Sequence, residues 1–145
     1  MLFRSNLDAS TIGADTTGGN IDLANASAAT FTSLTTGTGS ITVVNNGSAT
    51  FTTATTTSGQ IDLTVNSGNL TVGTSVTAGG AGKNVTLTTT TSGNVILTGT
   101  TTAGGDTISV TSAGNINGAG QVTSATIDLN ANTGIGNTKI GRAHV

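Results

Sequence analysis

Residues 20–39 read NIDLANASAATFTSLTTGTG, and residues 40–59 read SITVVNNGSATFTTATTTSG. Aligned without a gap, the two stretches are identical at 9 of 20 positions. The identical pairs are Ile21/Ile41, Asn25/Asn45, Ala29/Ala49, Thr30/Thr50, Phe31/Phe51, Thr32/Thr52, Thr35/Thr55, Thr36/Thr56 and Gly39/Gly59. A repeat of this length, with short apolar runs between Gly, Ser and Asn, is typical of a solenoid coil that stacks on its neighbours.

The same pattern continues along the chain, because small Gly-containing turns are followed by apolar–polar–apolar triplets. The triplets are Ile21-Asp22-Leu23, Ile41-Thr42-Val43, Ile61-Asp62-Leu63, Leu70-Thr71-Val72, Val85-Thr86-Leu87, Val95-Ile96-Leu97, Ile108-Ser109-Val110 and Ile127-Asp128-Leu129. Alternation with a period of two residues places one face of a strand in the core and the other in water. We therefore expect an all-β, parallel β-helix (β-solenoid) of about six coils of roughly 20 residues.

The coil length drifts after the first repeats. From Ile61, the next triplets in phase begin at Val85, Ile108 and Ile127, at intervals of 24, 23 and 19 residues. The extra residues fall in two Gly-rich runs, AGGAGK (78–83) and TTAGGD (101–106). Because lengthening a loop costs only about 0.6 kcal/mol per doubling, we expect these insertions at corners while the stacked strands keep their register.

Composition excludes several classes of protein. With 34% apolar and 2% aromatic residues, the chain is too lean for a well-filled globular core. Disorder is opposed by a charged fraction of only 7%, the absence of Pro and the periodic β-branched residues. The absence of Cys excludes disulfides and thiolate metal sites. No apolar run approaches the roughly 18 residues of a membrane helix, and no signal-peptide pattern is seen at the start.

The two termini differ from the repeats. Residues 1–5 (MLFRS) and the tail at 139–145, which ends in IGRAHV, read as translations of a DNA-sequencing adapter. We therefore assign residues 6–138 to the solenoid and treat this segment as an interior piece of a longer protein. Without the two ends, the segment holds six Asp and almost no basic residue, so it is acidic.

Stacking must hold the coils together, because one coil buries too few side chains to offset the entropy lost in ordering it. We expect backbone hydrogen bonds between coils and columns of like side chains along the axis. The predicted columns are Ile21/Ile41/Ile61, Phe31/Phe51/Leu70 and Asn25/Asn45. Glycines before the triplets are expected to supply backbone angles that other residues avoid. Strand edges at the two ends of the segment would make it fray or aggregate.

The runs GNIDLANASA, SGNVILTGTTTAGGDTISVTSAGNINGAG and ATIDLNANTGIGNT resemble the repeat region of filamentous-haemagglutinin-like adhesins and autotransporter passengers of Gram-negative bacteria. The resemblance covers residues 6–138. It implies a right-handed parallel β-helix that is exported through an outer-membrane pore and displayed at the cell surface for adhesion. The sequence shows neither an N-terminal secretion cap nor a C-terminal translocator barrel, so the export route comes from the resemblance alone.

The aspartates are the first candidates for ligands or catalysts. Asp22, Asp62 and Asp128 occupy the outward middle positions of their triplets and read as surface charge, with a weak cation or glycan contact as the alternative. A β-helix hydrolase or lyase would need Asp clustered with Lys, Arg or His. Asp106 follows two glycines, but the spacing of a calcium-binding GGxGxD repeat is not met.

Two local motifs read as structural. AGGAGK lacks the frame GxxxxGK[ST] of a phosphate loop, because Lys83 is followed by Asn84, and reads as a corner loop. Asn25, Asn46 and Asn84 begin N-glycosylation patterns, which read as chance matches in an Asn- and Thr-rich chain. We therefore propose no catalytic, cofactor-binding or metal-binding residue from the sequence.

Threonine arrays support a rival function. Hydroxyls are expected on one strand face in Thr30-Phe31-Thr32, Thr50-Phe51-Thr52, Thr86/Thr88/Thr90 and Thr98/Thr100/Thr102. Some ice-binding proteins carry a flat threonine grid on a β-solenoid. A grid needs equal coils, and the unequal intervals are expected to stagger its rows.

The sequence therefore predicts a non-enzymatic structural and adhesive stalk segment of a large secreted or outer-membrane-associated surface protein, with no cofactor. The alternatives are a non-catalytic portion of a carbohydrate-active β-helix enzyme and a Thr-rich ice-binding solenoid. Expected partners are neighbouring coils of the parent protein and host or surface glycans or other cells. Without a basic patch, nucleic-acid binding is not expected, and neither is membrane insertion by this segment.

Overall fold

Every regular element of the described residues is a β-strand. The computed structural model describes residues 3–136 and 141–144, and this part of the chain contains no helix. The strands are β1 (Phe3–Leu7), β2 (Thr11–Thr16), β3 (Ile21–Asn25), β4 (Ala29–Thr36), β5 (Ile41–Asn45), β6 (Ala49–Thr56), β7 (Ile61–Ser67), β8 (Leu70–Ala78), β9 (Val85–Ser92), β10 (Val95–Leu97), β11 (Thr100–Ala103), β12 (Thr107–Ser112), β13 (Asn115–Asn117), β14 (Gln121–Thr123), β15 (Thr126–Ala131), β16 (Gly134–Ile135) and β17 (Gly141–His144).

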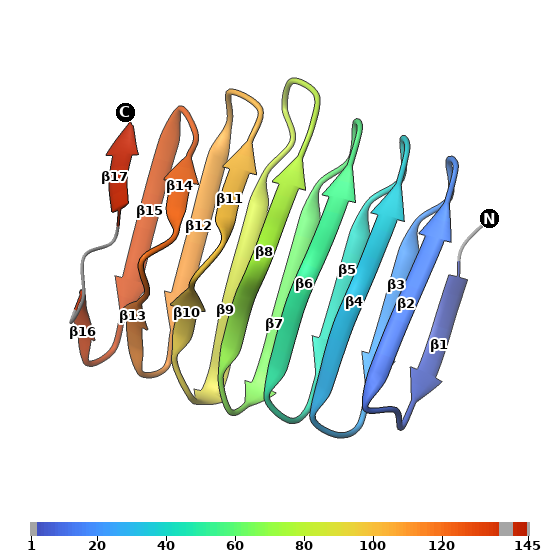
Figure 1. Cartoon of the computed structure of the whole chain (residues 1–145), viewed down its shortest axis with the longest axis horizontal. Coiled ribbons are helices and arrows are strands. Elements are labelled where there is room, and N and C mark those ends of the chain that lie inside the picture. The colour runs from blue at the N-terminus through green and yellow to red at the C-terminus, as the bar shows by residue number, and fades with distance from the viewer. Residues whose placement is uncertain (1–2, 137–140, 145) are drawn as a thin grey trace.

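The strands stack side by side along one axis in two layers, with the two ends of the chain at opposite ends of the stack (Figure 1). One sheet has seven strands in the order β1-β3-β5-β7-β9-β12-β15. In the other, β2, β4, β6 and β8 follow one another, and β8 then pairs with both β10 and β11. The pairings are parallel, so the fold is the predicted β-solenoid of about six coils.

The second sheet bends at a corner, which divides each coil into three sides. In β4, the successive residues Thr32 and Ser33 are both exposed, whereas the residues on either side alternate between core and surface. Beyond β8 the corner interrupts the strand, so two short strands continue its path. We name the seven-stranded sheet side A, the part of the second sheet before the corner side B, and the part after it side C.

The predicted isoleucine column is present on side A. Ile21 pairs with Ile41, and Ile41 pairs with Ile61. The column then continues through Val85, Ile108 and Ile127. The unequal intervals between these residues therefore do not disturb the register, because the additional residues lie outside the paired positions.

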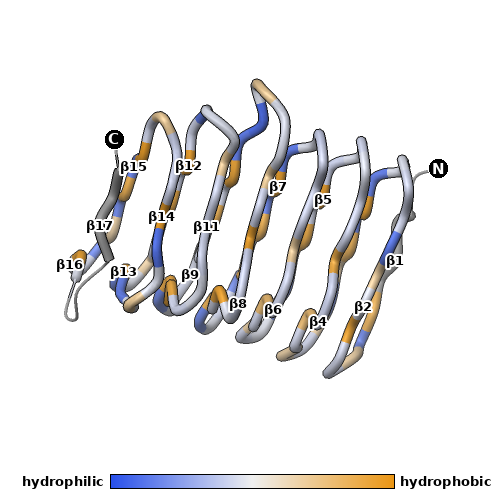
Figure 2. Tube along the Cα trace, turned by 45° about the horizontal axis from the view of Figure 1, so that its top comes forward, coloured by the Kyte–Doolittle hydropathy of each residue, from blue (hydrophilic) through white to orange (hydrophobic). Residues whose placement is uncertain are grey.

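Inward side chains form one continuous core along the axis. Hydrophobic residues accordingly recur from coil to coil along the trace (Figure 2). The first, third and fifth residues of both β3 and β5 are buried, because alternation puts every second side chain inside. Phe31 and Phe51 are fully buried and stacked, with ring centroids 4.7 Å apart and an interplanar angle of 11°. Asn25 Nδ2 donates a hydrogen bond of 2.8 Å to Asn45 Oδ1, also inside the coil. Both predicted like-on-like pairs are confirmed.

The predicted continuation of the phenylalanine column was wrong. Phe51 pairs with Val72, and Leu70 pairs with Ala49 instead. Ala49 and Leu70 are the first residues of β6 and β8, and each directly follows a turn. A residue's position in its strand therefore places it in a column here, even where the paired side chains differ in size.

The glycines at the turns have two different roles, whereas the sequence predicts only one, the supply of unusual backbone angles. Gly68, in the turn between β7 and β8, has φ of +100°, which residues with a Cβ avoid. Gly59 is not among the glycines with positive φ, but a Cβ added there would overlap the carbonyl oxygen of Gly39 in the preceding coil. Gly59 is therefore required by the close approach of two stacked turns.

Both Gly-rich runs lie at corners, but the second run also contributes three residues to a strand. Gly79–Asn84 forms the loop between β8 and β9, after Ala78 ends β8. In the second run, residues 101–103 belong to β11, so only the residues from Gly104 to Asp106 form the turn. Pairing with β8 holds residues 101–103 in a strand because they align with Val76, Thr77 and Ala78.

The residues that we assign to adapter sequence lie partly outside the described residues, which exclude 1–2, 137–140 and 145. Phe3–Leu7 forms β1 and pairs in parallel with β3, and Gly141–His144 forms β17 and pairs with β14. Both short segments therefore continue the stack. The origin of their coding sequence stays a prediction.

Candidate functional site

The three triplet aspartates share one column on the outer surface of side A. Asp22 pairs with Thr42, which pairs with Asp62, and two further coils separate Asp62 from Asp128. At about 4.8 Å per coil, Asp22 and Asp62 are about 10 Å apart, and Asp62 and Asp128 about 14 Å. The carboxylates are thus too widely spaced to share one metal ion. Asp62 Oδ2 instead accepts a hydrogen bond of 3.2 Å from Gln60 Nε2.

Asp106 organises the corner between β11 and β12. Its Oδ2 accepts a hydrogen bond of 3.0 Å from the backbone N–H of Lys83 in the neighbouring corner loop. Its carbonyl oxygen accepts hydrogen bonds from the Ser124 hydroxyl and, at 2.9 Å, from the Thr126 N–H. Asn84 Oδ1 in turn accepts from the Thr107 N–H at 3.1 Å. AGGAGK therefore lies in a corner loop, as expected, and Asp106 connects successive corners.

Asparagine amides at other turns also connect successive coils. The Asn94 N–H donates a hydrogen bond of 2.9 Å to Asn69 Oδ1, and the Asn115 N–H donates one of 2.8 Å to Asn94 Oδ1. Asn46, which begins a glycosylation pattern, accepts 2.7 Å from Asn66 Nδ2. Asn25, which begins another, is buried. These amides satisfy backbone and side-chain groups of neighbouring turns, which is a structural role.

A shallow hollow of about 280 Å³ lies at the N-terminal end of side A. Its lining is Leu7, Ala24, Asn25, Ala26, Val44 and Asn46. Its asparagine side chains already have partners. The Ala9 N–H donates a hydrogen bond of 2.9 Å to Asn25 Oδ1, and Asn46 Oδ1 accepts one from Asn66 Nδ2. Because no titratable side chain lines the hollow, it provides no acid, base or nucleophile.

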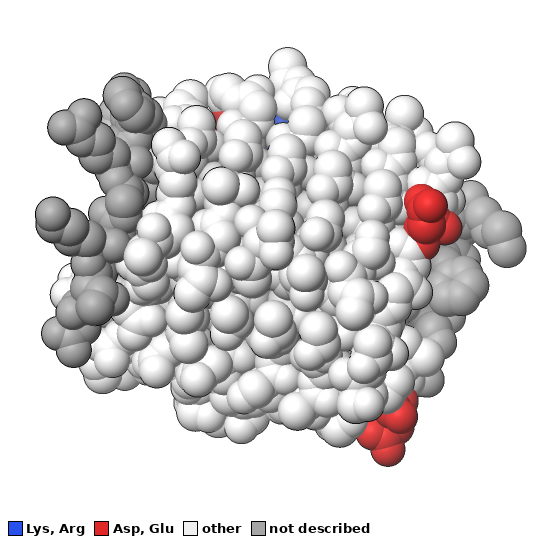
Figure 3. Space-filling view, in the orientation of Figure 1, with Lys and Arg blue, Asp and Glu red and all other residues white. Residues whose placement is uncertain are grey.

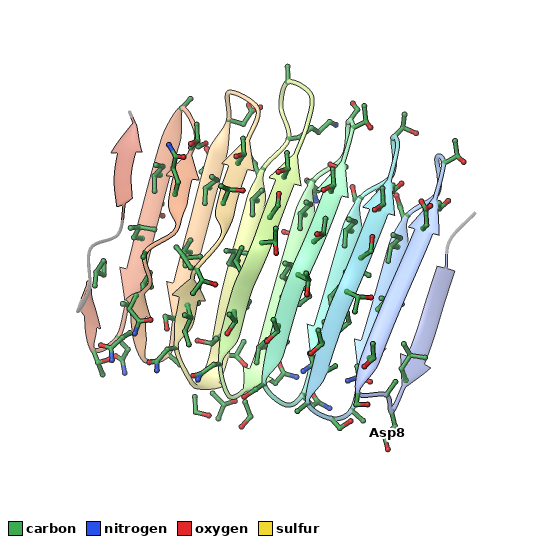
Figure 4. The ribbon with its side chains drawn as sticks, in the orientation of Figure 1. Asp8 is labelled. Carbon is green, nitrogen blue, oxygen red and sulfur yellow. The ribbon has the colours of Figure 1, made fainter. Side chains whose placement is uncertain are left out.

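Asp8 lies at the turn between β1 and β2, away from the hydroxyl-rich surface of the strands (Figure 4). Its Oδ1 accepts a hydrogen bond of 2.7 Å from the Ser27 hydroxyl of the next coil. Asp8 therefore also takes part in coil stacking. The described carboxylates of Asp8, Asp62 and Asp106 each have such a local partner, and none of them converges with another.

The most regular surface feature is a two-column set of hydroxyls on side C, which we name the hydroxyl array. Each coil contributes a pair of residues separated by one buried residue. The members are Ser33, Thr35, Thr53, Thr55, Ser75, Thr77, Thr100 and Thr102. Thr35, Thr55, Thr77 and Thr102 stand in one column, and Thr123 extends it to a fifth coil. The array therefore covers at least four successive coils.

The second column of the array is paired from Thr53 to Thr100. Thr53 pairs with Ser75, and Ser75 pairs with Thr100. Ser33 precedes Leu34 as Thr53 precedes Ala54, and Leu34 pairs with Ala54. No array residue is buried. Two hydroxyl pairs lie within hydrogen-bond distance along the strand, Ser33–Thr35 at 3.3 Å and Ser75–Thr77 at 3.0 Å.

The strands that carry the array contain no charged residue. The strands β4, β6, β8, β11 and β14 contain no Asp, Glu, Lys or Arg. The space-filling view of this side is accordingly uncoloured over its centre, with large acidic groups near the N-terminal end and small traces of acidic and basic atoms at the upper edge (Figure 3). Asp15 lies there, in the same column as Thr35. The array is thus a neutral, polar surface bordered by a carboxylate.

The expectation of staggered threonine rows was wrong. The longer coils keep their extra residues in corner loops, so the paired strands remain aligned. Thr30 and Thr32 lie outward on either side of buried Phe31, as expected, but they belong to side B, because the corner at Thr32 and Ser33 separates them from side C. The motif [S/T]-x-T recurs at Ser33, Thr53, Ser75 and Thr100, but it also occurs outside the array, for example at Thr30 and Thr86.

The described residues contain no group of three or more His, Cys, Asp or Glu that could hold a metal ion. The same part of the chain contains no helix long and apolar enough to cross a membrane. No family model, curated protein or solved structure matches the chain.

Proposed function

We propose that this chain is a non-enzymatic structural and adhesive stalk segment of a large bacterial protein, secreted or held at the cell surface. The observation that carries the proposal is the unbroken register of side-chain columns along the axis, such as the column from Ile21 to Ile127. Each coil adds about 4.8 Å in one direction. Such a stack gains length by addition of coils, which suits a spacer between a cell and a distal binding region.

The resemblance of residues 6–138 to filamentous-haemagglutinin-like and autotransporter passenger repeats supports the same role. In this proposal, neighbouring coils of the parent protein are the first partners, because parallel strands pair with further strands at each end of a stack. Glycans or other cells are the second class of partner. Weak contacts repeated on successive coils would add to a useful avidity.

Removal of one whole coil tests the spacer role. Deletion of residues 40–59 joins two turns at equivalent positions, because Gly39 and Gly59 occupy the same place in successive coils. We expect the shortened chain to fold and to lose about 4.8 Å of length in small-angle scattering. Deletion of residues 40–49 removes half a coil and should abolish the β-sheet signal in circular dichroism. Equal loss of fold in both variants would contradict an additive stack.

The coding DNA beyond the segment tests the proposed context. A secretion or translocator domain in the same reading frame supports the adhesin stalk. Adjoining coils with clustered Asp, Lys and Arg on one face would contradict it and favour a carbohydrate-active enzyme. Agglutination by cells that display the segment, compared with cells that display an unrelated solenoid, measures adhesion directly.

A further inference from the structure

The hydroxyl array repeats at two fixed distances. Successive coils are about 4.8 Å apart, and the two columns of one coil are two residues, or about 6.6 Å, apart along the strand. Figure 1 shows the contributing strands β4, β6, β8 and β11 side by side and nearly aligned. The members therefore form a two-dimensional lattice, since the pairings Thr55–Thr77 and Thr77–Thr102 fix one direction and the strand fixes the other.

The array is also stiff. Threonine has a branched Cβ, which restricts χ1, and the backbone below each member is held in a sheet on both sides. Contacts at 3.0 Å between Ser75 and Thr77 and at 3.3 Å between Ser33 and Thr35 further limit hydroxyl rotation. A stiff, short side chain loses little conformational entropy when it meets a rigid surface. The array is therefore preorganised for a rigid partner.

The chemistry of the array selects the class of partner. A threonine presents a methyl group and a hydroxyl that both donates and accepts hydrogen bonds. The absence of charge on these strands disfavours nucleic acids and charged polymers. The phenylalanines Phe31 and Phe51 are buried, so they offer no ring surface on which a sugar could stack.

We propose that the hydroxyl array is a binding face for crystalline water, so that the chain adsorbs to ice. Ice is neutral, and it presents both donors and acceptors at lattice sites whose repeats are of the same scale as those of the array. Each hydroxyl contact is weak, but the aligned coils engage the surface together. This role is additional to the stalk role and does not depend on it.

Slow growth of ice from a solution of the full chain tests the proposal, with the fraction of protein retained in ice and thermal hysteresis as readouts. The array variant is Thr55→Lys with Thr77→Lys, because two long cationic side chains in the central coils break the flat face. The control variant is Thr42→Lys with Thr86→Lys, on the outer surface of side A. Circular dichroism of all three proteins checks the fold.

We expect the unmodified chain and the control variant to be retained in ice and to show hysteresis, and the array variant to fall to the level of a non-binding reference protein. If the lysine variant does not fold, Thr55→Val with Thr77→Val removes the hydroxyls but keeps the branched Cβ, and should reduce retention several-fold. Retention of the unmodified chain no greater than the reference overturns the proposal. Equal loss in array and control variants also overturns it, as does array-dependent binding to crystalline cellulose without retention in ice.

Discussion

The first full coils, residues 20–59, and the later coils, residues 85–131, build the same cross-section by different means. The first coils are 20 residues long, and β4 and β6 each pass the corner without interruption. In the later coils the intervals are 23 and 19 residues, and the corner divides the path into β10 and β11 and then β13 and β14. The parallel pairing nevertheless continues through both regions.

The comparison shows which part of a coil determines register. A slip of one residue would exchange the inner and outer faces of a strand, which the buried columns oppose. Extra residues in a corner loop cost little, because loop entropy changes slowly with length. Register is therefore set by the strands and turns, whereas coil length is free to vary.

The two regions also differ in their buried contacts. The first coils contain stacked Phe31 and Phe51 and the hydrogen-bonded pair Asn25 and Asn45. At the position of the asparagines, the later coils carry Thr89 and Ser112, with hydroxyls 3.4 Å apart. Identical ladders thus stabilise the regular coils, and smaller hydroxyl contacts serve the same positions in the irregular ones.

The largest expected effect comes from the close approach of turns in the regular coils. Gly59→Ala places a Cβ against the carbonyl oxygen of Gly39, so one stacked turn must move away from the other. We expect a loss of about 3 kcal/mol in the free energy of unfolding, measured by urea denaturation.

The matched control lies in the irregular region. Gly82→Ala has open space around the new Cβ, but its φ of +74° costs about 1 kcal/mol. If the two substitutions cost the same, backbone angle alone would explain the glycines, and the stacked-turn explanation would fail.

The roles of these glycines illustrate what could and could not be predicted from the sequence. The repeat in residues 20–59 was sufficient to predict the all-β solenoid, and the columns Ile21/Ile41/Ile61 and Asn25/Asn45 followed from identity at equal spacing. The distance between stacked turns could not be read from sequence, because it depends on the packing of one coil against the next. The role of Gly59 was therefore misassigned.

The candidate site shows the same limit. Threonine is abundant in every coil, so composition alone could not separate the array from other outward residues. The corner at Thr32 and Ser33 decides the separation, and it depends on two successive outward residues that no triplet marks. Leu70 was misplaced for a related reason, because its position in its strand places it in its column.

An intermediate effect is expected from the buried polar pair. Asn45→Ala removes the acceptor for Asn25 Nδ2 and the donor to the Gly47 carbonyl, at 2.8 and 2.5 Å. Because these groups are buried or half-buried, we expect a loss of about 2 kcal/mol in the free energy of unfolding. The corresponding change in the irregular coils, Ser112→Ala, removes hydrogen bonds of one hydroxyl, such as that of 2.9 Å to the Asn115 carbonyl, and should cost about 1 kcal/mol. A larger loss for Ser112→Ala in the same denaturation assay would contradict the greater role of the ladder.

The smallest expected effect is a gain in stability. Thr101 is fully buried between Val76 and Val122 in its column, and its Oγ1 has no hydrogen-bond partner. Thr101→Val replaces this hydroxyl by a methyl group of similar size, so the desolvation penalty disappears and the free energy of unfolding should rise by about 1 kcal/mol. The control Thr102→Val alters the outward neighbour and should stay within about 0.5 kcal/mol of the unmodified chain. Thermal and urea unfolding of both variants measure the difference. Destabilisation by Thr101→Val alone would mean that this hydroxyl stabilises the irregular coils, and that their buried polar groups are as well matched as the asparagine pair of the regular ones.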